Sequence, residues 1–143
     1  MLKKTVFFLT ILWIGVIWIH SSMPADISSG ESGAVAQWLE SIGLVADGEV
    51  IEHIIRKIAH FVEFGILGFL VMLNVYINFK PNKEYFLTAL LFGILIPLID
   101  ETIQLFPQGR NSSVVDVWLD FSGYFTGAVI LITVYKKLIN HYK

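Results

Sequence analysis

The sequence predicts an all-α membrane protein, built as a four-transmembrane-helix bundle with a short interfacial helix in the first outer loop. The first observation is that 55% of its 143 residues are hydrophobic, which is high for a soluble domain. The second is that the apolar residues gather into four blocks, 5–19, 58–79, 85–106 and 114–135. A spanning helix needs about 20 mostly apolar residues. We therefore predict helices over 2–20, 54–79, 85–106 and 113–137, in a single membrane domain over 1–143.

The first apolar block, 5–19, has two interpretations. Lys3 and Lys4 followed by an apolar run describe a secretory signal peptide as well as a membrane helix. The segment that follows, 20–25, has no A-x-A cleavage pattern and contains Pro24. We therefore expect an uncleaved first helix. The chain has no cysteine, which excludes lipoprotein processing, disulfides, thiol catalysis and thiolate metal sites.

The placement of basic residues predicts the orientation of the helices. Lysines lie near both termini and in the second loop, at Lys3, Lys4, Lys80, Lys83, Lys136, Lys137 and Lys143. The first loop, 21–52, contains acidic residues but no lysine or arginine. The positive-inside rule then predicts that both termini are cytoplasmic and that the first and third loops are outside. Within the first loop, apolar residues over 34–42 recur with helical spacing, which predicts the interfacial helix.

Ionisable side chains interrupt three of the apolar segments. They are Arg56, His60, Glu63, Asp100, Glu101, Asp116 and Asp120. An ionisable group in hydrocarbon costs roughly 3 kcal/mol on insertion scales, so such residues usually face a bundle interior and mark a functional site. Antiparallel threading brings the start of the second helix, the end of the third and the start of the fourth to the outer side. We therefore predict one polar site in a single layer near that end.

Three further residues are predicted to shape the helices around this site. Pro97 should kink the third helix just before its two acidic residues, because proline removes a backbone hydrogen bond. Gly123 and Gly127 share a face of the fourth helix with the acidic residues of that helix. Small residues four apart allow membrane helices to approach closely, so this face is predicted to be a helix contact.

The charged residues also form a motif. The stretches RKIAHFVEFGILGFL and DETIQLFPQGRNSSVVDVWLDFSG, together with SSMPADISS, resemble the VanZ-like membrane protein family over nearly the whole chain. The motif places are taken by Lys57, His60, Glu63, Asp100, Glu101, Gln104, Arg110, Asp116, Asp120 and Gly123. At a variable place this chain has Asp120 rather than asparagine, which adds a carboxylate. The resemblance implies a small protein of the bacterial cytoplasmic membrane associated with lowered susceptibility to lipid-tailed glycopeptides such as teicoplanin. It implies no particular reaction.

Three chemical interpretations fit these residues. In the first, Arg56 and Arg110 pair with the acidic groups in a structural network that holds the helices together. In the second, carboxylate oxygens hold Mg²⁺ or Mn²⁺, and the candidate metal ligands are Asp116, Asp120 and Glu101. In the third, basic groups bind a phosphate, because the guanidinium fork matches phosphate oxygens. For that role the predicted ligand-binding residues are Arg56, Lys57, Gln104 and Arg110.

The functions considered follow from these interpretations. The leading one is an outer-leaflet polar pocket that binds membrane lipids of the cell envelope with a phosphate or sugar head, such as a glycolipid, or a lipid-tailed glycopeptide. The alternative is an intramembrane enzyme that modifies such a lipid, for which the candidate catalytic residues are His60, Glu63, Asp100 and Glu101. Nucleic-acid binding is excluded, because the net charge is −2 and no basic stretch exceeds two residues.

Overall fold

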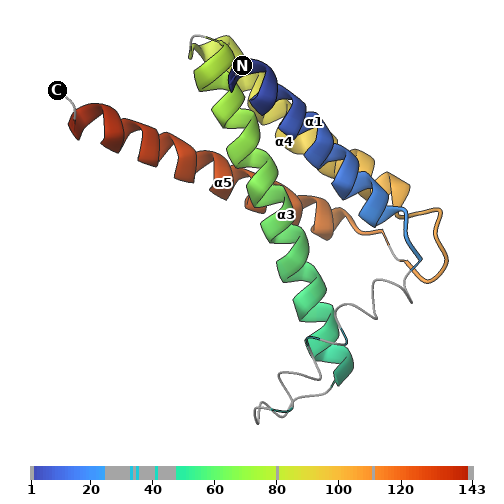
Figure 1. Ribbon diagram of the computed structural model, residues 1–143. Coiled ribbons are helices and arrows are strands. Elements are labelled where there is room, and N and C mark those ends of the chain that lie inside the picture. The colour runs from blue at the N-terminus through green and yellow to red at the C-terminus, as the bar shows by residue number, and fades with distance from the viewer. Residues whose placement is uncertain are drawn as a thin grey trace.

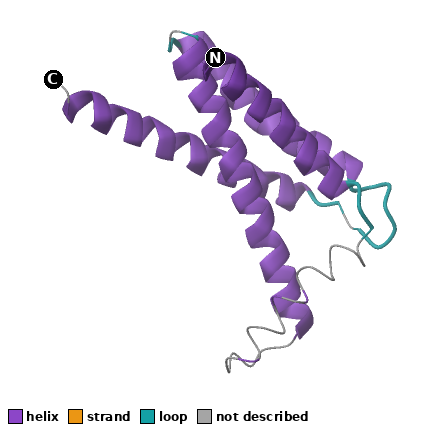
Figure 2. Cartoon of the chain, in the orientation of Figure 1, coloured by secondary structure: helices purple, strands orange, loops and turns teal. Residues whose placement is uncertain are grey.

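The computed structural model describes residues 2–24, 33, 35, 41, 48–79, 81–110 and 112–141. It contains the helices α1 (Leu2–Ser21), α3 (Gly48–Asn78), α4 (Lys83–Ile103) and α5 (Val114–His141), as Figure 1 shows. Residues 22–24, 79, 81–82, 104–110 and 112–113 form loops and turns, and no strand occurs among the described residues (Figure 2). All four helices are long and apolar enough to cross a membrane, which confirms the predicted all-α class with four candidate spans. The interfacial helix expected over 34–42 lies almost wholly outside the described residues.

Three helix ends differ from the predicted ranges by more than two residues. α3 begins at Gly48 rather than at 54, and the added turns include a helical i,i+4 ion pair between Glu52 and Arg56 at 3.2 Å. α4 ends at Ile103 rather than at 106, because the next residues form tight hydrogen-bonded turns. α5 continues to His141, past the predicted end at 137. Helical structure thus extends beyond the apolar blocks, since polar residues are compatible with a helix once it leaves hydrocarbon.

The helix directions agree with threading back and forth across a membrane. α3 and α5 run in the same direction, and their contacts extend from the Lys57–Asp116 ion pair to the Tyr76–Tyr135 ring pair. α1 and α4 lie beside each other, and both run in the direction opposite to that of α3 and α5 (Figure 1). As a result, the C-terminal ends of α1 and α4 lie at the same end of the molecule as the first turns of α5.

Glycines allow the backbones of α3 and α5 to touch where the two helices cross. A Cβ atom added at Gly127 would overlap the backbone of Gly65, and one added at Gly123 would overlap that of Phe61. Gly68 on α3 makes a third contact of this kind with the α5 backbone. Small residues at such positions are typical of closely packed membrane helices. The sequence pattern predicts only the α5 half of this interface, at Gly123 and Gly127.

An apolar cluster lies next to the charged layer and joins all four helices. Its buried members are Ile17, Phe64, Leu67, Ile96 and Tyr124. The Tyr124 hydroxyl donates to the Ala89 carbonyl at 2.6 Å, so its one polar group is satisfied. α4 continues as one helix through the buried Pro97. The acidic residues that follow Pro97 are therefore held on a packed helix rather than on a loop.

Candidate functional site

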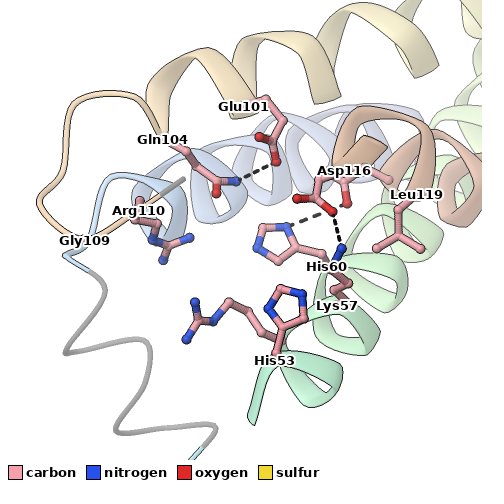
Figure 3. A pocket seen from close by; sticks show the side chains of 11 residues that line it. His53, Lys57, His60, Glu101, Gln104, Gly109, Arg110, Asp116 and Leu119 are labelled. Carbon is pink, nitrogen blue, oxygen red and sulfur yellow. Dashed lines mark hydrogen bonds and ion pairs between the residues drawn. The ribbon is translucent and has the colours of Figure 1, made fainter. Parts of the chain in front are cut away.

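A polar cavity of about 130 Å³ lies at the end of the molecule where α1 and α4 finish (Figure 3). It is lined by His53, Arg56, Lys57, His60, Glu101, Gln104, Gly109, Arg110, Asp116, Leu119 and Asp120. Eight of these lining residues belong to the predicted site, and the other two predicted ionisable residues, Glu63 and Asp100, lie outside the lining. At roughly 30 Å³ per water, the space suits a small polar group with a few waters rather than a whole lipid.

Asp100 and Glu101 on α4 are held by neutral donors from three parts of the chain. The Ser21 hydroxyl at the end of α1 donates to Asp100 Oδ1, and Gln104 Nε2 donates to Asp100 Oδ2 at 2.9 Å. Gln104 Nε2 also lies 3.3 Å from Glu101 Oε1 (Figure 3). The backbone N–H of Ser113 donates to Glu101 Oε2 at 2.8 Å. Together these bonds connect α1, α4 and the segment before α5.

Among the described residues, two hydrogen-bonded pairs of ionisable side chains connect α3 to its neighbours. Lys57 Nζ donates to Asp116 Oδ1 on α5 at 2.8 Å (Figure 3). Glu63 Oε1 lies 2.9 Å from Nδ1 of His20, on α1. His20 was not among the predicted site residues, because its place at the edge of the first apolar block resembled an ordinary membrane boundary. It nevertheless lies at the level of the charged layer, and its ring stacks on that of His60 with 6.5 Å between centroids.

Arg110, in the loop between α4 and α5, bonds to the end of α1. Its Nε donates to the Met23 carbonyl at 3.1 Å, and its Nη2 donates to the His20 carbonyl at 3.0 Å. The His20 carbonyl also accepts from the backbone N–H of Met23 at 3.2 Å, and Met23 lies just past the end of α1, so Arg110 adds bonds that hold the turn following this helix. Burial lowers the pKa of Arg110 below its ordinary value, and the nearby Arg56 acts in the same direction. A guanidinium nevertheless stays charged in proteins, so Arg110 brings a cation to the cavity wall.

In the predicted network, Arg56 and Arg110 pair with the acidic groups of the site. In the structure, Arg110 and Nη2 of Arg56 form hydrogen bonds with other groups. The hydrogen bonds of Arg110 go to backbone carbonyls, and Arg56 Nη2 bonds to Glu52 on its own helix. Four acidic groups are instead held by serine, glutamine, lysine and histidine side chains or by a backbone N–H, namely Glu63, Asp100, Glu101 and Asp116. The positions of the ionisable residues along the helices predict that they lie in one layer. They do not predict which of these side chains contact each other.

Asp120 is the least compensated acidic group of the site. Its side chain is 1% exposed, and neither carboxylate oxygen has a hydrogen-bond partner in the described part of the chain. His60 Nδ1, 3.8 Å from Asp120 Oδ1, is likewise buried without a hydrogen-bond partner among those residues. With Asp100, these residues offer ligand atoms that all lie within 4.8 Å of one another. This buried group could hold a metal ion.

The metal ligands predicted from the sequence share only Asp120 with this group. Asp116 is paired with Lys57, and Glu101 accepts hydrogen bonds from Gln104 and Ser113. The group that could hold a metal therefore combines a histidine of α3 with carboxylates of α4 and α5, whereas the predicted ligands were all carboxylates. The possibility that His60 serves as a ligand was visible in the sequence, but its proximity to Asp120 depends on how α3 and α5 cross.

An apolar groove adjoins the polar cavity. Lys57 and Leu119 line both the cavity and a neighbouring hollow of about 340 Å³, whose other lining residues are Ile54, Ile58 and Phe61. Phe61 in turn also lines a second hollow of about 340 Å³ that follows α3 and α5 past their glycine contacts. Both hollows are lined almost entirely by apolar residues on α3 and α5 and share Phe61, and together they are called the apolar groove.

Fold and site together define an integral membrane protein with four apolar helices and a polar, acid-rich cavity at one end. The family model described as VanZ/LLP1 matches residues 6–135. The chain therefore belongs to the VanZ/LLP1 family, which confirms the resemblance seen in its motifs. No curated protein and no solved structure matches the chain.

Proposed function

We propose that the protein binds an envelope lipid, holding a phosphate- or sugar-bearing head in the polar cavity and an acyl chain in the apolar groove. A lipid-tailed glycopeptide has the same two-part chemistry and is a second source of such a ligand. The observation that carries the proposal is that the cavity and the groove share Lys57 and Leu119. A ligand that is polar at one end and apolar at the other can fill both without leaving the membrane.

The charges on the cavity wall favour an anionic head group that also carries hydroxyl or ammonium groups. Arg56, Lys57 and Arg110 supply cationic N–H donors, which suit phosphate oxygens. Glu101 and Asp116 supply acceptors for hydroxyl or ammonium groups on the same head. A purely apolar ligand would offer these charged side chains no hydrogen-bond partner. The cavity should therefore bind ligands with a polar head more tightly.

A second candidate function is catalysis on the same lipid. It is favoured by the unpartnered His60 Nδ1 and Asp120 carboxylate, within the described residues, at the wall of the cavity. An imidazole and a carboxylate in this setting are suited to act as a general base and a metal ligand. Glu63 is less suited to the role of base, because His20 already occupies one of its oxygens.

A tryptophan at Leu119, where the cavity meets the groove, should weaken the binding of a whole lipid more than the binding of its head group alone. In Leu119→Trp, the indole would fill the passage between cavity and groove, and we expect retention of lipid to fall at least tenfold. The matched control is Val129→Trp, on an exposed surface of the same helix, which should retain lipid like the wild type. Native mass spectrometry after incubation with phosphatidylglycerol, a diglucosyl diacylglycerol or teicoplanin measures retention and distinguishes the sources of the ligand.

Soluble glycerol phosphate, which has no acyl chain, should bind equally to the wild type and to both tryptophan variants. Equal lipid retention by Leu119→Trp and Val129→Trp would contradict the proposal that an acyl chain binds in the apolar groove. A change in the mass of the bound lipid with time would instead establish the catalytic function.

We also propose that the cavity opens on the outer side of the cytoplasmic membrane, with both termini inside. The distribution of lysine between the loops supports this orientation. Because the chain has no native cysteine, single cysteines can be labelled without background. Gly48→Cys, at the start of α3, should react with an impermeant maleimide on intact cells, whereas Asn82→Cys, before α4, should react only after permeabilisation. The reverse pattern would place the cavity at the cytoplasmic leaflet.

A further inference from the structure

We propose that His60, Asp100 and Asp120 form a binding site for one divalent transition-metal ion, of the class of Zn²⁺ or Mn²⁺, next to the head-group cavity. The three ligands come from α3, α4 and α5, so the ion would connect three of the four helices. This inference goes beyond the proposed lipid binding, because the ion would occupy its site with or without a lipid.

The geometry of the group suits a first-row ion. Such ions bind nitrogen and oxygen at about 2.1 Å, so ligand atoms at neighbouring tetrahedral positions on one ion lie about 3.4 Å apart. The candidate ligand atoms of His60, Asp100 and Asp120 already lie within 4.8 Å of one another. Side-chain rotations that bring these atoms roughly 1 Å closer together would complete the site.

The charges of the group call for a cation. Asp100 and Asp120 are 0% and 1% exposed, and an unpaired buried charge is strongly unfavourable. Asp100 is hydrogen-bonded only by neutral side chains, and no hydrogen-bond partner of Asp120 occurs among the described residues. The nearby ammonium of Lys57 is already paired with Asp116. One divalent ion would neutralise the two carboxylates, and the neutral imidazole would supply a third ligand atom.

The donor set distinguishes between classes of metal ion. Mg²⁺ and Ca²⁺ are bound mainly by oxygen ligands, whereas an imidazole nitrogen beside carboxylates suits Zn²⁺ and Mn²⁺. The hydrogen bonds from Ser21 and Gln104 also orient the Asp100 carboxylate, as outer partners commonly orient metal ligands. A carboxylate has about four lone-pair sites, so these two bonds leave room for an ion.

The position of the site relates it to the cavity. His60 and Asp120 line the cavity, whereas Asp100 is not among its lining residues. With three protein ligands, the ion would keep at least one position open to the cavity. A water or a phosphate oxygen of a bound head group could take that position. The ion would thus add a positive charge next to Asp120 on a wall that otherwise depends on Arg56, Lys57 and Arg110.

Metal analysis of matched variants tests the proposal. The full chain, purified in detergent without a histidine tag, is stripped with chelator, incubated with Zn²⁺ or Mn²⁺ and freed of unbound ion by gel filtration. We expect about one ion per chain in the wild type and in Glu84→Gln, whose exposed carboxylate at the start of α4 lies outside the cavity. Asp120→Asn and His60→Gln should each retain at least tenfold less.

Circular dichroism and gel filtration establish that each variant is folded, and His60→Gln carries the comparison if Asp120→Asn does not fold. A wild type without stoichiometric ion would overturn the proposal, as would equal loss from Glu84→Gln and from the ligand variants. The same samples are incubated with phosphatidylglycerol. Retention of the ion without retention of lipid would overturn the proposed function and leave the metal site standing.

Discussion

Gly127→Ala is expected to destabilise the protein by about 2–3 kcal/mol, in the range for overpacking a buried contact. The added methyl group would overlap the backbone of Gly65 on α3. Backbone atoms cannot rotate out of the way as a side chain can, so α3 and α5 must move apart. The Lys57–Asp116 ion pair joins the same two helices, and its separation should increase as well.

Gly15→Ala is the matched control for this substitution. A Cβ atom at Gly15 of α1 would meet no heavy atom within 4 Å. Alanine exceeds glycine in helix propensity by up to about 1 kcal/mol, so this change should be neutral or stabilising. Denaturant unfolding in detergent, followed by circular dichroism, measures both variants. Effects of the same sign and size at the two glycines would contradict the backbone contact between α3 and α5.

Arg110→Lys is expected to lower the affinity for a phosphate-bearing lipid at least tenfold, while the free energy of unfolding falls by about 1–3 kcal/mol. The guanidinium lines the cavity (Figure 3). It also bonds to the carbonyls of Met23 and His20. A lysine keeps the charge, but its single ammonium lacks the planar fork that reaches both carbonyls and a phosphate. Native mass spectrometry with phosphatidylglycerol measures affinity, and denaturant unfolding measures stability.

Two further variants separate fork geometry from charge. Arg110→Gln removes the charge as well and should bind no better than Arg110→Lys. In Arg56→Lys, a lysine can replace the 3.2 Å bond to Glu52, so a smaller loss of affinity is expected. If Arg110→Lys lost folded yield and lipid affinity in equal proportion, the role of Arg110 would be limited to holding the end of α1.

Local patterns in the sequence determined the four helices and the layer in which the polar residues lie. Each helix satisfies its own backbone hydrogen bonds, so the length of an apolar block predicts a span without knowledge of its neighbours. An ionisable side chain in such a span must avoid hydrocarbon, so residues such as His60 and Asp100 could be expected to face inward at one end. The motif carried by these same residues indicated the family before the fold was known.

Only the tertiary structure decided which side chains meet within that layer. Helix rotation and crossing determine whether residues at the same depth are partners, and both depend on contacts between distant parts of the chain. The close approach of α3 and α5 at Gly65 and Gly127 places His60 beside Asp120. The ends of α1 and α4 lie side by side, which brings Ser21 to Asp100. Neither pairing can be read from one helix, because each depends on atoms that a second helix supplies.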